Sequence, residues 1–155
     1  MPHRLTTDIT LDCPLDEVFA FFSDASNLEA ITPPELRFRI LTPLPIEMQR
    51  GRLIDYRLSL FGIPFSWRTE IAEWDMPHRF VDRQLQGPFA LWEHEHRFEA
   101  LSASRTRIRD EVRYALPLEP FGRLAHPIVR ARLDHIFAFR TERVTALLGR
   151  RAHAA

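Results

Sequence analysis

Apolar and polar residues alternate with a period of two along most of the first 117 positions, which is the spacing of half-buried β-strands. Residues 4–12 show the pattern first, with leucine, isoleucine and threonine on one face and polar side chains on the other. The same alternation recurs in six further stretches, at residues 36–42, 52–62, 64–74, 78–86, 89–101 and 104–117. Turn signals rich in Gly, Pro, Asp and Ser separate them, which predicts about seven strands joined mostly as antiparallel hairpins.

A helical spacing follows the first strand. Residues 14–23 begin with Pro14, carry acidic residues in the first turn and repeat phenylalanines at helical intervals, which predicts a short helix. A second short helix is expected at residues 25–31, because Pro33 and Pro34 prevent it from continuing.

The last part of the chain has the longest helical pattern. Between residues 121 and 148, large apolar residues recur every three or four positions with arginines between them, which predicts one long amphipathic helix ending near Gly149. Residues 150–155 are expected to form a frayed tail, so that residues 1–149 make up a single domain. The order of elements predicts an α+β fold, in which a curved antiparallel sheet holds the long helix over its concave face and leaves a cavity between them.

Composition narrows the possible function classes. The chain has 155 residues, of which 45% are hydrophobic, enough for one core. Its 21 basic and 21 acidic residues balance, so no overall field favours nucleic acid. All the basic residues are arginines, which excludes a Schiff-base lysine and the lysine of a phosphate-binding loop. The apolar runs are short and the first residues are polar, so we expect no membrane span, no secretory signal and a cytoplasmic location.

Four stretches of the chain, in order, resemble the START-like (SRPBCC) superfamily, which has the helix-grip fold and includes the polyketide cyclase/dehydrase-like proteins of bacteria. They are CPLDEVFAFFSDASNLEAITPP, GPFALWEHEHRFEAL, DEVRYALP and the terminal LDHIFAFRTERV. The resemblance covers nearly the whole chain and implies a hydrophobic cavity that binds a lipid, a polyketide or a similar small molecule. It brings no shared catalytic motif, because the superfamily places different chemistry in similar cavities.

Two histidines fall on an otherwise apolar strand face. If residues 89–101 form a strand, His94 and His96 share its inner face with aromatic residues, while the glutamates between them face solvent. In residues 104–117, arginines occupy most of the alternate positions, so Asp110 lies on the inner face. Asp110 is therefore expected beside either His94 or His96 across the hairpin. An acidic partner would explain why polar imidazoles are buried there.

This His–Asp cluster has four interpretations. The groups satisfy one another inside a core, or they orient a ligand's carbonyl or hydroxyl group. In the third interpretation, His94 or His96 carries a proton for acid–base catalysis and Asp110 holds it in one tautomer. In the fourth, the two histidines bind a metal ion with Asp82 or Asp110, but the sequence offers no further ligand, so we expect no metal and no other cofactor.

Arg140 interrupts the apolar stripe of the long helix. It follows Ile136 by four residues, so its guanidinium is expected at the mouth of the cavity or at the seam between helix and sheet. There it either pairs with an acid or binds an anionic group of a ligand. The acids considered as partners are Asp82, Glu70 and Asp110.

These observations predict a domain that binds a hydrophobic or amphipathic small molecule between the long helix and the sheet. The alternatives are an enzyme of the aromatase/cyclase or dehydratase kind, with His94, His96 and Asp110 as candidate catalytic residues, and a protein-interaction domain with a filled core. No nucleic-acid partner is expected, and the chain is expected to be a monomer or a homodimer. The predicted ligand-binding residues are Tyr56, Trp67, Asp82, Trp92, His94, His96, Asp110, Tyr114, Phe137 and Arg140.

Overall fold

One curved sheet and one long helix dominate the computed structural model, which describes residues 2–154 and the side chains of residues 2–149. The elements are, in order, β1 (His3–Leu11), α1 (Leu15–Phe22), the 3-10 helices η1 (Ala25–Ile31) and η2 (Pro34–Leu36), β2 (Arg39–Ile40), β3 (Leu53–Leu60), β4 (Ile63–Asp75), β5 (Arg79–Gln86), β6 (Leu91–Ser102), β7 (Arg105–Ala115) and α2 (Phe121–Ala154).

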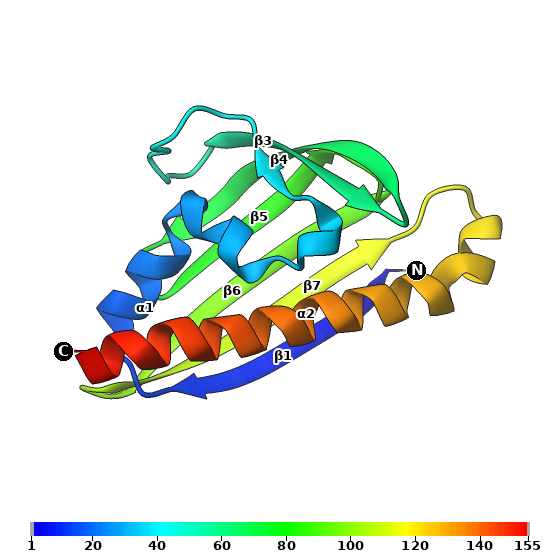
Figure 1. Ribbon diagram of the computed structural model, residues 1–155. Helices are drawn as coiled ribbons and strands as arrows, with labels where there is room; N and C mark the ends of the chain where they lie inside the picture. Colours follow the sequence, from blue (N-terminus) through cyan, green and yellow to red (C-terminus); the bar gives the residue numbers. More distant parts are fainter. Residues whose placement is uncertain (1, 155) are drawn as a thin grey trace.

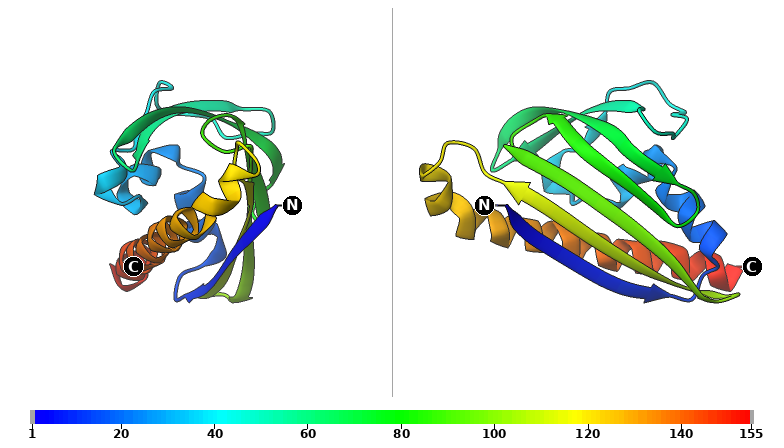
Figure 2. Two further views of the ribbon diagram at one scale, coloured as in Figure 1. Left: turned by 90° about the vertical axis from the view of Figure 1, so that its right-hand side faces the viewer. Right: turned by 180° about the vertical axis from the view of Figure 1, so that it is seen from behind.

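The seven strands form a single antiparallel sheet in the order β1-β7-β6-β5-β4-β3-β2. Helix α2 runs along one face of this sheet (Figure 1), and the sheet curves around it (Figure 2). The short helices lie on the same side of the sheet as α2, with α1 against β6 and β7 and η2 against β3. The predicted α+β helix-grip arrangement is therefore confirmed.

The period of two decides which side chains of the sheet reach the core. On β7, every even-numbered side chain from Thr106 to Tyr114 is buried, and the odd-numbered ones are exposed or half-buried. On β6, His94 and His96 are buried while the glutamates beside them are half-buried or exposed. The inner faces of these two strands are therefore those predicted from the sequence, because alternation is a local property of an extended backbone.

Apolar side chains from both helices close the core against the sheet. Helix α1 buries four residues, Val18, Phe19, Phe21 and Phe22. Helix α2 buries Leu133 and Phe137 in its middle and Val144 and Leu148 further along. The hydroxyl of Thr106 donates a hydrogen bond of 2.7 Å to the carbonyl of Cys13, which ties the chain after β1 to β7. The core therefore lies between α2, α1 and the concave face of the sheet.

Two early boundaries differ from the sequence-based prediction. Residues 36–42 were expected to form a full strand, but only Arg39–Ile40 does. The reason is that η2 takes up the chain to Leu36 and Arg37 then adopts a left-handed conformation with φ of 49°. The segment at residues 25–31 is helical as expected, but it is a 3-10 helix.

Helix α2 is longer than predicted. It continues past Gly149 to Ala154, so the tail expected at residues 150–155 is helical as far as the structure describes it. Gly149 is not in the left-handed conformation that ends many helices, and the arginine and alanine residues after it favour helix. Ala155 lies outside the described residues. Within the described part of the chain, neither α2 nor any other helix is long and apolar enough to cross a membrane.

Candidate functional site

A cavity of about 180 Å³ lies between α2, the two 3-10 helices and strands β3 to β6. Its wall is mostly apolar and rich in aromatic rings. Trp67 belongs to this wall, and its ring lies 5.9 Å from the stacked ring of Tyr56 and 5.4 Å from the edge-on ring of Trp92. The 3-10 helices close the far side with Leu28, Ile31 and Leu36. One stretch of the wall is polar, and it carries the residues singled out from the sequence.

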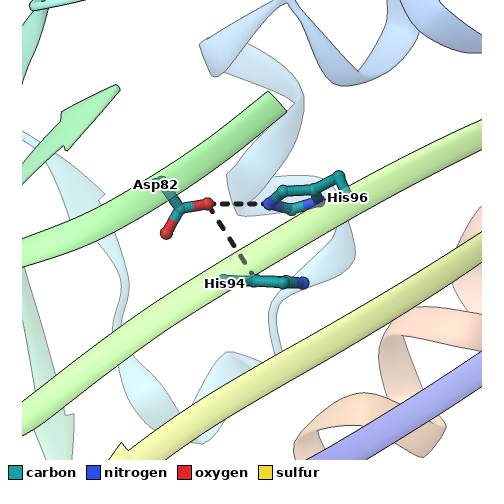
Figure 3. Close-up of side chains that lie close together, drawn as sticks. All are labelled: Asp82, His94 and His96. Carbon is teal, nitrogen blue, oxygen red and sulfur yellow. Dashed lines mark hydrogen bonds and ion pairs between the residues drawn. The ribbon is translucent and has the colours of Figure 1, made fainter. Parts of the chain in front are cut away.

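Strands β5 and β7 lie on either side of β6, and each places one aspartate beside the histidines of β6. The register places Asp82 of β5 opposite His94, and Asp110 of β7 opposite His96. His96 Nε2 lies 2.7 Å from Asp82 Oδ2, and its Nδ1 lies 3.3 Å from Asp110 Oδ1. His94 lies against the same acids, with Nε2 3.4 Å from Asp110 Oδ1 and Nδ1 4.0 Å from Asp82 Oδ2. Figure 3 shows Asp82 directed toward both imidazoles.

Helix α2 adds a cation to this cluster. Arg140 Nε lies 4.0 Å from Asp110 Oδ2, and its Nη2 lies 3.4 Å from His96 Nδ1. The guanidinium also lies over the ring of Phe22, 5.3 Å from its centre, which is cation–π geometry. Of the acids considered from the sequence, Asp110 is therefore the partner that the fold supplies.

The protonation states in the cluster follow from burial and from the neighbouring charges. Burial lowers the pKa of His94 to about 4, and the nearby His96 adds to the effect, so His94 is neutral at pH 7. Burial also acts to lower the pKa of His96, but the hydrogen bonds and charges of Asp110 and Asp82 outweigh it and raise that pKa. His96 therefore stays protonated to a higher pH than a free imidazole.

Both carboxylates are held in the charged form. Burial acts to raise the pKa of Asp110, but the charge of Arg140 and the two histidines overcome it and hold that pKa well below the usual value. Burial opposes ionisation of Asp82 as well, yet the hydrogen bond from His96 and the charges nearby lower its pKa. At a pH below the pKa of His96, the negative charges of Asp82 and Asp110 are therefore balanced by the positive charges of His96 and Arg140.

Asp82, His94 and His96 also offer ligand atoms within 4.8 Å of one another, the trio considered for a metal ion. The two imidazole rings are stacked, with centroids 3.7 Å apart and planes inclined by 26°. Asp82 Oδ2 and His96 Nε2 are 2.7 Å apart, a hydrogen-bond distance, whereas two ligands of one tetrahedral zinc ion lie about 3.3 Å apart. The geometry is that of a hydrogen-bonded network.

Three buried polar atoms have no hydrogen-bond partner among the described residues: Trp67 Nε1, His94 Nε2 and Asp110 Oδ1. The last two face each other at 3.4 Å without hydrogen-bond geometry. Trp67 and His94 both belong to the cavity wall. His94 Nε2 faces Asp110 behind the wall, however, so its missing hydrogen bond, which costs about 1–3 kcal/mol, is not directed at the cavity.

Most of the predicted ligand-binding residues lie on the cavity wall. They are Tyr56, Trp67, Asp82, Trp92, His94, His96, Phe137 and Arg140. Asp110 lies behind the histidines, outside the lining, and accepts a hydrogen bond of 3.2 Å from Thr7 Oγ1 of β1. Tyr114 is also outside the lining, because β7 is farther from the cavity than β6. Its hydroxyl lies 3.0 Å from His126 Nε2, at the start of α2.

Sequence reasoning missed the part of the wall that the 3-10 helices supply. Ala25, Leu28 and Ile31 of η1 have helical spacing, but that spacing does not show whether a buried face packs into a core or lines a cavity. It also missed Thr69 and Phe89, which lie on the wall beside predicted residues. Thr69 shares its strand face with Trp67, and this alternation was the signal that could have identified it.

The fold and the cavity define this protein as a START-like (SRPBCC) helix-grip domain. The chain belongs to the family described as polyketide cyclase / dehydrase and lipid transport, which it matches over residues 11–139. No curated protein sequence matches the chain.

Solved structures of low sequence identity share the fold. The Zhui aromatase/cyclase from Streptomyces sp. R1128 has a TM-score of 0.79 and 18% identity, over 97% of this chain and 96% of that one. A START superfamily protein from Mycobacterium smegmatis has a TM-score of 0.68 and 16% identity, over 94% and 99%. A norcoclaurine synthase from Thalictrum flavum has a TM-score of 0.72 and 12% identity, over 100% and 98%. Similarities at this level of identity establish the fold alone.

Proposed function

We propose that this protein binds a hydrophobic or amphipathic small molecule, lipid- or polyketide-like, in the cavity between α2 and the sheet. The observation that carries the proposal is an aromatic cavity whose otherwise apolar wall holds a cluster of polar side chains, Asp82, His94, His96 and Arg140. The apolar part of the ligand would lie against Trp67 and Phe137. A hydroxyl or carbonyl group would lie against the polar cluster, where His94 is neutral and offers one donor and one acceptor.

The size of the cavity supports a small occupant. Its volume of about 180 Å³ exceeds the roughly 150 Å³ of an engineered apolar cavity that binds benzene. It is smaller than most drug-binding pockets, which measure about 300–1,000 Å³. The enclosed space is therefore suited to one or two rings.

An acid–base enzyme of the aromatase/cyclase or dehydratase kind is the second candidate. The observation in its favour is that His96, with a raised pKa, lies on the cavity wall between Asp82 and Asp110. Both ring nitrogens of His96 face carboxylates, so a ligand's carbonyl oxygen would have to displace Asp82 from Nε2 before the protonated imidazole could donate a proton to it. Turnover of a bound polyketide-like substrate, with a titration that disappears in His96→Gln, would favour this function over binding alone.

Binding is tested with small phenols. We expect 4-methylphenol and 2-naphthol to quench tryptophan fluorescence and to give a one-site isotherm by calorimetry, since Trp67 and Trp92 line the cavity. His94→Phe should weaken binding about twofold to tenfold through the loss of one hydrogen bond. Ile136→Trp, which adds bulk on the wall from α2, should abolish binding.

Ala138→Trp is the matched control, because Ala138 lies on the same helix but is exposed and outside the cavity. Native mass spectrometry of gently purified protein should detect a co-purifying small molecule. Absence of binding by both phenols, together with absence of a co-purifying molecule, would favour a filled core and contradict the proposal.

The cytoplasmic location, the oligomeric state and the lack of a nucleic-acid partner remain predictions from the sequence.

A further inference from the structure

One end of the molecule carries large apolar side chains that are more than half exposed. Leu118, Phe121, Leu124 and Ile128 come from the connection after β7 and the start of α2, and Phe61 and Ile63 come from the turn between β3 and β4. Their exposed fractions range from 51% for Phe61 to 80% for Leu124. Figure 1 shows that the β3–β4 turn, the β5–β6 turn and the start of α2 gather at the same end of the sheet. Large clustered apolar surfaces of this kind often mark binding sites.

A groove of about 300 Å³ is lined by four of these side chains, Phe61, Ile63, Leu118 and Phe121. Its lining is apolar except for Arg132, whose guanidinium lies 5.2 Å from the centre of the Phe61 ring. Leu60, Phe89 and Leu133 line both this groove and the internal cavity. The partition between the two spaces is therefore made of three apolar side chains, from β3, the β5–β6 turn and α2.

The three side chains of the partition are not equally fixed. Both backbone groups of Phe89 are bonded to the Gln84 side chain, at 2.7 Å and 3.1 Å, and its ring packs 4.8 Å from that of Trp92. Leu60 and Leu133 are held by apolar packing alone, and leucine side chains change rotamer without breaking a hydrogen bond. A path between the cavity and the groove therefore opens most readily between these two leucines.

We infer that the groove is the second part of the ligand site and receives an apolar tail whose polar head lies in the cavity. The inference rests on the proposed binding function and specifies the ligand class: a long amphiphile with a small, uncharged, ring-sized head and a linear hydrocarbon tail. The head is uncharged because most of the cavity wall is apolar and its charged side chains, Asp82 and Arg140, already lie against His96 and Asp110. The tail is linear because it must pass between Leu60 and Leu133 to reach the groove, whose lining is apolar except for Arg132.

A series of 4-alkylphenols with tails from methyl to heptyl tests the inference by calorimetry. Each methylene buried in the groove should strengthen binding by about fourfold, and the gain should continue beyond the tail length that the cavity alone can hold. Ala125 is exposed and lines the groove but not the cavity. Ala125→Trp should therefore weaken binding of 4-heptylphenol at least tenfold and leave that of 4-methylphenol unchanged. Ala138→Trp, on the same helix, should change neither.

The possible failures are distinguishable. If 4-methylphenol does not bind, the proposed function fails and the inference fails with it. If 4-methylphenol binds but the affinity stops rising at short tails and Ala125→Trp has no effect, only the inference is overturned. Equal weakening of short and long phenols by Ala125→Trp would also overturn it. So would a native dimer that Ala125→Trp converts to a monomer, because a second copy of the chain would then cover the groove.

Discussion

At the scale of single residues, the central feature is His96, which has a carboxylate at each ring nitrogen. A neutral imidazole would direct a lone pair at one of these carboxylates, so the protonated form is favoured. His94, 3.7 Å away in the same stack, is held neutral by burial and by the charge of His96. The pKa values of these two histidines of one strand are therefore shifted in opposite directions, that of His94 down and that of His96 up.

We predict that the two imidazoles titrate far apart. In an NMR pH titration, His94 should titrate near pH 4 and His96 above pH 6.5. Asp82→Asn should lower the pKa of His96, because it removes the carboxylate bonded to Nε2. Asp134→Asn, which changes an exposed acid paired with Arg130 on α2, should leave both values unchanged. Identical titration of the two histidines would contradict this account of the cluster.

We also predict that His94 makes the protein acid-sensitive. Its pKa is lower in the folded chain than the 6.5 of the unfolded chain, so its contribution to stability is present above pH 6.5 and is lost as the pH falls toward 4. The loss is on the order of 3 kcal/mol, from the difference between a pKa of 6.5 and one of about 4. Urea unfolding from pH 7 to pH 5 should show a smaller loss of stability for His94→Phe than for the native protein. An equal loss of stability in His94→Phe and in the native protein would contradict the prediction.

The sign is opposite for His96. Its pKa is raised in the folded chain, so its contribution is fully present below pH 6.5 and is lost as the pH rises through the raised value. In the same urea series, the free energy of unfolding of the native protein should therefore decrease as the pH rises above neutrality. In His96→Gln this decrease should be smaller. A variant that retained the native alkaline slope would show that another group causes it.

At the scale of elements, α2 determines how far the core and the site extend. The same helix supplies the wall residues Leu133 and Phe137, the cation Arg140 and, at its start, part of the exposed groove. Its helical spacing is regular enough to predict the element, but its end was predicted too early. The error arose at Gly149, because a glycine near the end of a helical pattern resembles a cap.

The position of Gly149 inside α2 leads to a stability prediction. A Cβ atom added there meets no atom within 4 Å, and its φ is not in the left-handed region. Gly149→Ala should therefore stabilise the protein by about 0.5–1 kcal/mol, because alanine loses less backbone entropy in a helix. Gly51→Ala should destabilise it, since Gly51 has φ of 88°. Thermal unfolding of both variants checks the contrast, and a loss of stability in Gly149→Ala would contradict it.

At the scale of the whole molecule, the cavity exists because α2 and the 3-10 helices cover different parts of one curved sheet. Strands β3 to β6 supply the floor, and no single element contains enough of the wall to bind a ligand. A molecule bound there would contact elements that lie far apart in the sequence, so binding should stabilise the fold as a unit.

We predict a measurable increase in melting temperature on binding. At a free ligand concentration of 100 times Kd, the stabilisation is about 2.7 kcal/mol. For a domain of this size, each kcal/mol raises Tm by about 2–4 °C, so the expected increase is about 5–10 °C. The measurement is calorimetry with 2-naphthol, and Ile136→Trp should remove the effect. An equal increase in that variant would show that the phenol acts outside the cavity.

The sequence by itself determined the local features of this protein. The inner faces of β6 and β7 follow from the period of two, and the place of Arg140 on the apolar side of α2 follows from helical spacing. The proximity of an acid to the two histidines could be predicted for the same reason, since neighbouring strands of a hairpin pair in sequence order. These features depend on backbone geometry that operates over a few residues.

Only the tertiary structure decided the register of the strands and which elements form the wall of the cavity. It placed Asp110 opposite His96, brought Asp82 into the same network and left Tyr114 outside the cavity. It also placed the 3-10 helices on the far wall and an apolar groove beside the cavity. The physical reason is that register, sheet curvature and the packing of a distant helix are set by burial of the whole core, and no local pattern encodes them.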